Sequence, residues 1–182
     1  GIVGPHVGNM PLWCFLAQTP LTRPGPKLRA LAAGFAISPG KEIDTLHALS
    51  QAVLGAVAYE IGHTDAKTTA EEAMAAGRGV CQDHAHIFIG CARALGIPAR
   101  YVSGYLMMND RIDQEAGHGW AEAHVAGLGW VGFDVSNGQV GSVFAGAGGD
   151  ATIAALDVSR AQAGTFALSS TATTITLGTE TI

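Results

Sequence analysis

The chain has 182 residues, of which 48% are hydrophobic and 14% are charged. That length and apolar content suit one domain with a core of its own. The formal net charge is −5 and the ten lysines and arginines are scattered, which argues against a nucleic-acid-binding protein and against a polybasic membrane patch.

The first segment, residues 1–25, is expected to be irregular because it contains four prolines. It lacks the basic start and the long apolar stretch of a signal peptide. No apolar run in the chain approaches the ~18 residues that cross a bilayer. We therefore expect neither a signal peptide at this end nor insertion into a membrane.

Two helices are expected next. Apolar residues recur at helical spacing over 28–35 and again over 42–60, and the sequence SPGKE separates the two stretches. A third, short helix follows a polar loop and is expected to end at Gly77. Its start is predicted by one of two overlapping capping boxes, Thr68 with Glu71 or Thr69 with Glu72.

The fourth helix, over residues 81–95, is expected to be the central element. It is apolar on nearly all sides, which is typical of a buried helix. Gly96 suits the position just after a helix end, and Pro98 prevents the helix from continuing. We expect neighbouring elements to pack on several sides of this helix.

From residue 99 the pattern changes from helix to strand. The segment over 99–107 is rich in β-branched and aromatic residues and predicts a strand. The segment over 118–125 alternates, and another strand-like segment over 129–135 follows a short turn, so the two are expected to form a hairpin. The loop over 107–117 is either a flap over a site or an ordinary solvated loop.

The chain is expected to fold as a single domain over residues 1–182, since no internal repeat or second domain is apparent. Residues 139–182 form a Gly- and Ala-rich segment, with one or two closing strands expected over 165–177. Helices come first and antiparallel strands come later, which is the order of an α+β fold.

The three cysteines are expected to be free thiols. Cys81 and Cys91 stand ten positions apart on the central helix, which separates them by roughly 15 Å and rules out a disulfide. The sequence contains no Cys-x-x-Cys motif, so a zinc site formed by cysteines is not expected. Cys91 is expected to lie in the core, and Cys14 in the core or a loop. Free thiols favour a reducing compartment, so the cytoplasm is the favoured location.

Cys81 is the candidate nucleophile. It stands where a glycine-rich turn meets the central helix, so the helix dipole favours a thiolate and the free N–H groups there could hold an oxyanion. Asp83, in the same turn, would disfavour a thiolate, so an imidazolium partner is expected. Taken alone, Cys81 would be interpreted as a buried cysteine with only a packing role. The histidine and aspartate that follow it in the sequence, in that order, favour a catalytic role instead.

Two histidines on the expected hairpin, His118 and His124, could serve as the base. Asp134 ends the second strand. In a hairpin it falls opposite the start of the first strand, beside His118, whereas His124 lies near the turn. The geometry therefore selects Cys81, His118 and Asp134 as nucleophile, base and orienting group. As an alternative, Asp134 could be only a turn-forming residue before the sequence SNG.

Two segments carry three ordered motifs: GVCQDHAHIFIGCARALGIPARYVSGY and HGWAEAHVAGLGWVGFDVSNG. In them the chain resembles the bacterial transglutaminase-like cysteine protease family, over roughly residues 12–138. In that family the cysteine of Gly-x-Cys is the nucleophile, the histidine of His-x-Trp is the base, and the aspartate closing the next strand orients it. These roles fall on Cys81, His118 and Asp134. The resemblance implies a papain-like transglutaminase core, in which a cysteine-bearing helix packs against an antiparallel sheet.

The chain departs from the family pattern at several positions. The usual His-Ala-Trp is His-Gly-Trp here, the usual Asp-Pro-Thr is Asp-Val-Ser at 134–136, and His84 replaces a residue that is often aromatic. None of these changes removes a reacting atom. The calcium sites of animal transglutaminases have no counterpart, and we expect no metal site and no cofactor.

Further residues are candidates for the oxyanion hole or the cleft wall: Gln82, Trp120 and Tyr105. Packing is the alternative role for the two aromatic residues. His84 and His86 look like a metal-binding pair, but residues two apart on a helix point in different directions. We therefore expect both histidines to be structural.

The expected function is hydrolysis of a peptide or side-chain amide bond through a thioacyl-enzyme. Two alternatives remain open: an amine replaces water, which would make the protein a transamidase, or the fold is a catalytically silent binding module. The expected partner is a peptide or protein amide substrate. The sequence does not fix which substrate that is, or the oligomeric state.

Overall fold

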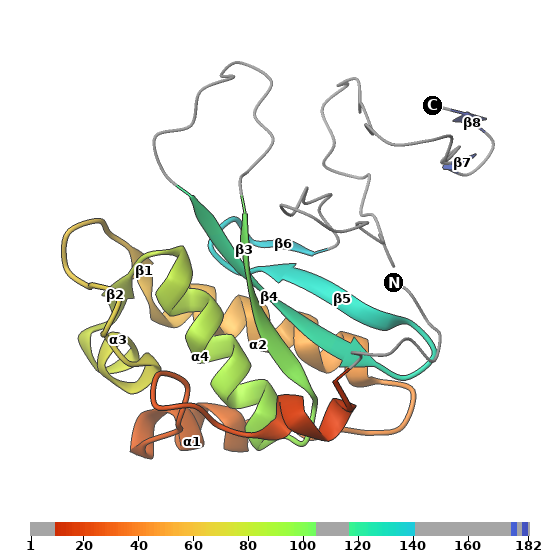
Figure 1. Cartoon of the computed structure of the whole chain (residues 1–182), viewed down its shortest axis with the longest axis horizontal. Helices are drawn as coiled ribbons and strands as arrows, with labels where there is room; N and C mark the ends of the chain where they lie inside the picture. The colour runs from red at the N-terminus through yellow and green to blue at the C-terminus, as the bar shows by residue number, and fades with distance from the viewer. Residues whose placement is uncertain (1–9, 105–116, 141–175, 178–179, 182) are drawn as a thin grey trace.

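The computed structural model describes residues 10–104, 117–140, 176–177 and 180–181. Helices precede the main sheet, as the α+β order predicts (Figure 1). The helical elements are η1 (Leu12–Leu16), α1 (Pro26–Ala33), α2 (Glu42–Ala56), α3 (Ala70–Ala76) and α4 (Cys81–Ala94). The strands are β1 (Ala58–Tyr59), β2 (Arg78–Gly79), β3 (Ala99–Gly104), β4 (His118–Val125), β5 (Gly129–Asp134), β6 (Gln139–Val140), β7 (Thr176–Leu177) and β8 (Glu180–Thr181).

The main sheet has four antiparallel strands in the order β3-β4-β5-β6. Alternate residues of β4 and β5 face the core, among them Ala121, Ala123 and Phe133. The two alanines are small enough to let α4 lie close to the sheet, and Phe88 of α4 stacks on Phe133 with ring centroids 4.8 Å apart.

Helix α4 is the centre of the domain, as predicted. Every residue from Asp83 to Ala92 is buried, and the helix contacts the sheet on one side and α1, α2 and α3 on the others (Figure 1). An apolar surface all around a helix can be buried only when neighbours cover every side. The sheet and the three helices together provide that cover and hold α4 in place.

Helices α1 and α2 end earlier than expected. The first helix is α1, which ends at Ala33 and not at residue 35. Helix α2 ends at Ala56 and not at residue 60, because the next residues form β1, which runs parallel to β2. The Ala58 N–H donates to the Gly77 carbonyl over 2.9 Å. This pairing anchors the chain that leads into α4.

The local signals around α3 are confirmed. Thr69 and Glu72 form the capping box, with the Glu72 N–H donating to the Thr69 hydroxyl over 3.2 Å. The helix ends at Gly77, which has a φ of 68° in the left-handed region that favours glycine.

Several predictions fall on residues outside the described ranges. They include the candidate flap over 107–116 and most of the closing strands over 165–177, of which only β7 is described. The single-domain organisation therefore stays a prediction. Within the described ranges, no helix is both long enough and apolar enough to cross a bilayer.

Candidate active site

Cys81 is the first residue of α4 and is half-buried. Asp83 fixes the start of this helix, because its Oδ2 accepts hydrogen bonds from the Val80 N–H over 2.8 Å and from the Thr64 hydroxyl over 2.6 Å. These bonds tie the first turn of α4 to the loop after β1. The first-turn acid expected from the sequence is thus buried and engaged with the backbone.

His118 and Asp134 meet across the hairpin of β4 and β5. His118 Nε2 lies 2.9 Å from Asp134 Oδ2, and their exposed fractions are only 9% and 1%. The Asn137 side-chain N–H donates to the same Oδ2 over 2.6 Å. Ala121 pairs with Phe133, a register that brings the end of β5 to the start of β4. This is the proximity that the sequence predicted.

The Cys81 sulfur and the His118 ring lie close enough for each to shift the pKa of the other. Burial raises the pKa of the thiol, but the hydrogen bond and the charge of His118, together with backbone N–H groups of Gly119 and Gln82, lower the pKa below its ordinary value. Because Nε2 faces Asp134, Nδ1 is the ring nitrogen left for the sulfur. The structure thus brings the three sequence-predicted residues into one chain of contacts.

The pKa of His118 moves in the opposite direction. Burial lowers it, but hydrogen bonds to Asp134 and Cys81 and the charges of both groups raise the pKa of this histidine to about 9. A lowered thiol pKa beside a raised imidazole pKa favours the thiolate–imidazolium pair. Such a pair is what a nucleophilic cysteine needs at neutral pH.

The three cleft candidates have different outcomes. Trp120 is 2% exposed, and its ring stacks beside His118 with centroids 6.2 Å apart; it therefore shields the histidine from solvent. The backbone N–H of Gln82 is one of the groups that lower the pKa of the Cys81 thiol. Tyr105 lies outside the described residues.

His84 connects α4 to two other elements. Its Nε2 donates to the Val57 carbonyl and its Nδ1 accepts from the Ser136 hydroxyl, each over 2.9 Å. Burial lowers the pKa of this histidine, consistent with a neutral ring that donates at one nitrogen and accepts at the other. His84 thereby holds the turn just after Asp134, through Ser136, to the end of α2.

The other two cysteines have different surroundings. Cys91 is fully buried, and burial raises the pKa of its thiol to about 12. That thiol faces the Leu28 carbonyl over 3.7 Å. Cys14 is partly exposed in η1.

His124, the alternative base, packs edge-on against Trp130 with centroids 5.5 Å apart, at the turn end of the hairpin.

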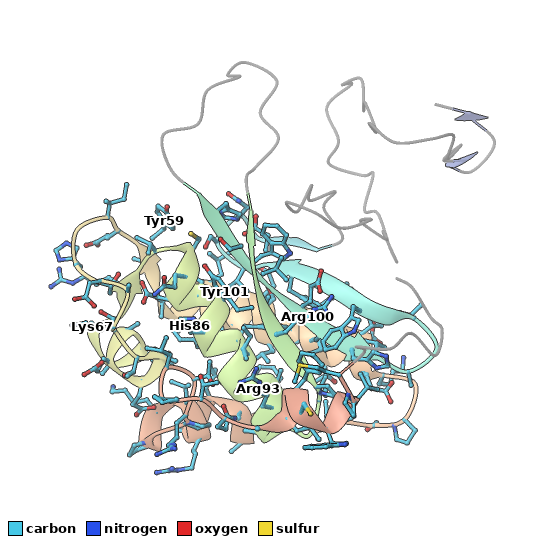
Figure 2. The ribbon with its side chains drawn as sticks, in the orientation of Figure 1. Tyr59, Lys67, His86, Arg93, Arg100 and Tyr101 are labelled. Atoms are coloured by element: carbon cyan, nitrogen blue, oxygen red, sulfur yellow. The ribbon has the colours of Figure 1, made fainter. Side chains whose placement is uncertain are left out.

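Two tyrosines that were not predicted from the sequence, Tyr59 and Tyr101, are affected by the charge of Cys81; both are labelled in Figure 2. The pKa of Tyr59 on β1 is raised by burial and by the charges of Cys81 and Asp134. The pKa of Tyr101 on β3 is raised by burial and by the charges of Cys81 and Asp83. The one sequence signal for Tyr101 was indirect: the glycine at position 119, where an alanine is usual, leaves space for a neighbouring side chain.

Residues 29–135 match the family model of the transglutaminase-like superfamily. The chain belongs to this superfamily. The match covers the segments that bear Cys81, His118 and Asp134, so the resemblance seen in the sequence is confirmed at the superfamily level.

Relatives in mycobacteria share part of this transglutaminase-like sequence. An uncharacterized protein of Mycobacterium tuberculosis, Rv2569c, is 35% identical over 108 residues, which cover 54% of this chain and 34% of that protein. The protein ML0607 of Mycobacterium leprae is 35% identical over 112 residues, 54% of this chain and 39% of that protein. The chain therefore spans little more than a third of the length of these relatives.

Solved structures support the transglutaminase-like fold. A candidate cysteine protease from Cytophaga hutchinsonii superposes with a TM-score of 0.58 and 28% identity, over 71% of this chain and 45% of that one. The periplasmic domain of TgpA from Pseudomonas aeruginosa gives a TM-score of 0.52 at 21% identity, over 70% of this chain and 47% of that one. The predicted α+β core with a cysteine-bearing helix against an antiparallel sheet is thus confirmed.

Proposed function

We propose that this transglutaminase-like protein is a cysteine-dependent hydrolase of peptide or side-chain amide bonds. The observation that carries the proposal is the 2.9 Å contact between the His118 ring and the Asp134 carboxylate, beside a Cys81 thiol whose pKa His118 lowers. The Cytophaga hutchinsonii neighbour, a candidate cysteine protease, supports the same class of reaction.

The reaction begins when the Cys81 thiolate attacks the substrate carbonyl carbon. The carbonyl π electrons move to oxygen, and the Cys81 N–H at the start of α4 donates a hydrogen bond to that oxyanion. The His118 imidazolium then protonates the leaving amine as the C–N bond breaks, which leaves a thioester on Cys81. Water attacks the thioester, His118 takes its proton, and the carboxylic acid is released.

Asp134 keeps His118 in the required orientation throughout these steps. Its Oδ2 holds Nε2, so Nδ1 stays directed at the sulfur and at the leaving group. The negative charge also stabilises the imidazolium, which forms whenever the thiolate does.

The test compares the intact protein with Cys81→Ala and with the matched control Cys91→Ala, against peptide and glutamine-amide libraries. We expect Cys81→Ala to lose all turnover and Cys91→Ala to keep it, because Cys91 is buried with a strongly raised pKa. Full turnover by Cys81→Ala on a substrate that the intact protein cleaves would contradict the proposal.

Two further measurements separate the alternatives. Incorporation of an added primary amine into the product, in place of water, would identify a transamidase. The rate of Cys81 alkylation by iodoacetamide, measured as a function of pH, tests whether the protein is a catalytically silent binding module. A midpoint near the ~8.5 of an ordinary free thiol, with no turnover of any amide, would assign the fold to binding and reject the enzyme.

A further inference from the structure

Tyr101 lies on β3 with 38% of its surface exposed. Its ring tilts against the His86 ring of α4, with centroids 5.2 Å apart, and Figure 2 shows it beside that helix. His86 is 7% exposed, so a buried ring supports one side of the phenol. The contact fixes where that hydroxyl points.

The hydroxyl points at Gly119, the residue after the candidate base. A Cβ at Gly119 would lie 2.7 Å from Tyr101 Cζ and 3.0 Å from Cε2, and closer still to the hydroxyl oxygen. No left-handed φ requires glycine at this position, so the missing side chain serves to make room for the phenol. The usual alanine of the family motif would collide with it.

Gly119 also lies near the nucleophile, because its backbone N–H is among the groups that lower the pKa of Cys81. The sulfur and the Tyr101 hydroxyl therefore approach the same residue, one at its nitrogen and the other at its Cα. A carbonyl carbon bonded to that sulfur would place its oxygen within reach of groups around Gly119. Within the described part of the chain, no hydrogen bond occupies the Tyr101 hydroxyl.

We propose that the Tyr101 hydroxyl is a second donor to the oxyanion, alongside the Cys81 N–H; this inference rests on the proposed function. The hydroxyl donates a hydrogen bond and keeps its proton, so no additional proton transfer is required. Burial and the charges of Cys81 and Asp83 raise the pKa of the phenol, which keeps it a donor at the pH values where Cys81 is a thiolate. Tyr101 is accordingly a catalytic residue.

The test uses two reagents that differ in whether an oxyanion forms. p-Nitrophenyl acetate acylates Cys81 through a tetrahedral oxyanion and releases p-nitrophenolate, whereas iodoacetamide alkylates the same sulfur by displacing iodide from a saturated carbon. For Tyr101→Phe we expect acylation to slow by about 10²-fold, with the alkylation rate and its pH midpoint unchanged. Gly119→Ala should slow acylation in the same way, because its Cβ displaces the hydroxyl.

Tyr59→Phe is the matched control, since it removes a hydroxyl from a tyrosine whose pKa is also raised by the Cys81 charge but whose ring lies by His84 and not by Gly119. It should leave both rates unchanged. Acylation of Tyr101→Phe at the rate of the intact protein overturns the inference and leaves the proposed function standing. An equal fall in acylation and alkylation also overturns it, because that would show a role in holding the sulfur. An intact protein that iodoacetamide alkylates at Cys81 but no ester or amide acylates refutes the proposed function itself, and the inference with it.

Discussion

At the scale of single residues, the charge of Asp134 is what distinguishes this site from an isolated cysteine and histidine. The carboxylate contributes both a hydrogen bond and a negative charge to the raised pKa of His118. The imidazolium in turn lowers the pKa of Cys81. The thiolate therefore depends on a residue that it does not touch, through the histidine between them.

We expect Asp134→Asn to keep the shape of this arrangement and lose its charge. The pKa of His118 should fall, the pKa of Cys81 should rise, and alkylation of Cys81 by iodoacetamide at pH 7 should slow roughly tenfold, the equivalent of about one pKa unit. The measurement is the pH–rate profile of alkylation, with the modified cysteine identified by mass spectrometry.

Glu122→Gln is the control for this substitution. Glu122 lies on β4, the strand that carries His118, but its carboxylate pairs with Arg100 over 2.6 Å. Loss of its charge should therefore leave the pH–rate profile of Cys81 alkylation unchanged. An Asp134→Asn profile that coincides with that of the intact protein would show that the carboxylate does not control the thiolate.

The sequence could predict the His118–Asp134 contact because it depends only on strand alternation and a short turn. Tyr101 could not be found in the same way. Its position near Cys81 depends on the direction of its ring across β3 and on the absence of a Cβ at Gly119, and both are properties of packed side chains. The sequence therefore predicts contacts that follow from the backbone pattern, such as that of His118 with Asp134. It does not predict contacts that depend on how side chains pack, such as those of Tyr101.

At the scale of elements, α1 begins at a cap supplied by another helix. Its own N-cap, Gly25, has no side chain to accept a hydrogen bond. The Glu71 carboxylate of α3 accepts instead from the backbone N–H groups of Gly25, Lys27 and Leu28, over 3.0, 2.7 and 3.1 Å. One carboxylate thus satisfies the free donors of α1 and joins the two helices.

We expect Glu71→Gln to lower the free energy of unfolding at pH 7 by about 1 kcal/mol, because a charged cap is replaced by a neutral one and the site is partly exposed to solvent. Burial raises the pKa of Glu71, but the three backbone hydrogen bonds outweigh it and lower that pKa overall. The stabilisation is therefore present above the unfolded value near 4.3 and is lost as the pH falls through the folded value.

Urea denaturation at pH 7 and in acid, below the carboxyl range, measures the effect. The two proteins should differ at pH 7 and converge in acid. Glu72→Gln is the matched control, since that neighbouring carboxylate is exposed and caps only its own helix through Thr69. A Glu72→Gln loss as large as that of Glu71→Gln would argue against the cap between helices.

The sequence predicted the start of α3 and left open which of two glutamates caps it. Thr69 and Glu72 were sufficient as a local signal. The role of Glu71 could not be predicted, because its partners lie more than forty positions away. The early end of α2 has the same cause, since β1 exists only by pairing with β2. A local signal fixed the start of α3, whereas contacts distant in sequence decided the start of α1 and the end of α2.

At the scale of the whole molecule, α4 carries the candidate nucleophile at one end and a structural junction at the other. Near its C-terminus, the Arg93 guanidinium donates to the Ala99 carbonyl at the start of β3 over 2.9 and 3.1 Å. It also donates to the Ala17 carbonyl over 2.9 Å and to the Thr22 hydroxyl over 3.2 Å. One side chain therefore joins the N-terminal segment, the central helix and the sheet.

We expect Arg93→Ala to lower the free energy of unfolding by about 2 kcal/mol, because four hydrogen bonds from a charged group are lost and the Ala17 and Ala99 carbonyls lose their partner. Arg93 lies twelve positions along α4 from Cys81, a distance of about 18 Å. The rate of Cys81 alkylation in the folded protein should therefore equal that of the unsubstituted chain. Because Arg93 no longer holds the N-terminal segment, trypsin should cleave the variant sooner after Arg23. Lys41→Ala provides the comparison: its ion pair with Asp44 is exposed, and its loss should cost at most about 0.5 kcal/mol. If Arg93→Ala were no less stable than Lys41→Ala, the N-terminal segment would be held by its other contacts, among them the hydrogen bond from the Gln18 side chain to the Gly90 carbonyl. Slower alkylation of Cys81 in Arg93→Ala would show that the two ends of α4 are coupled.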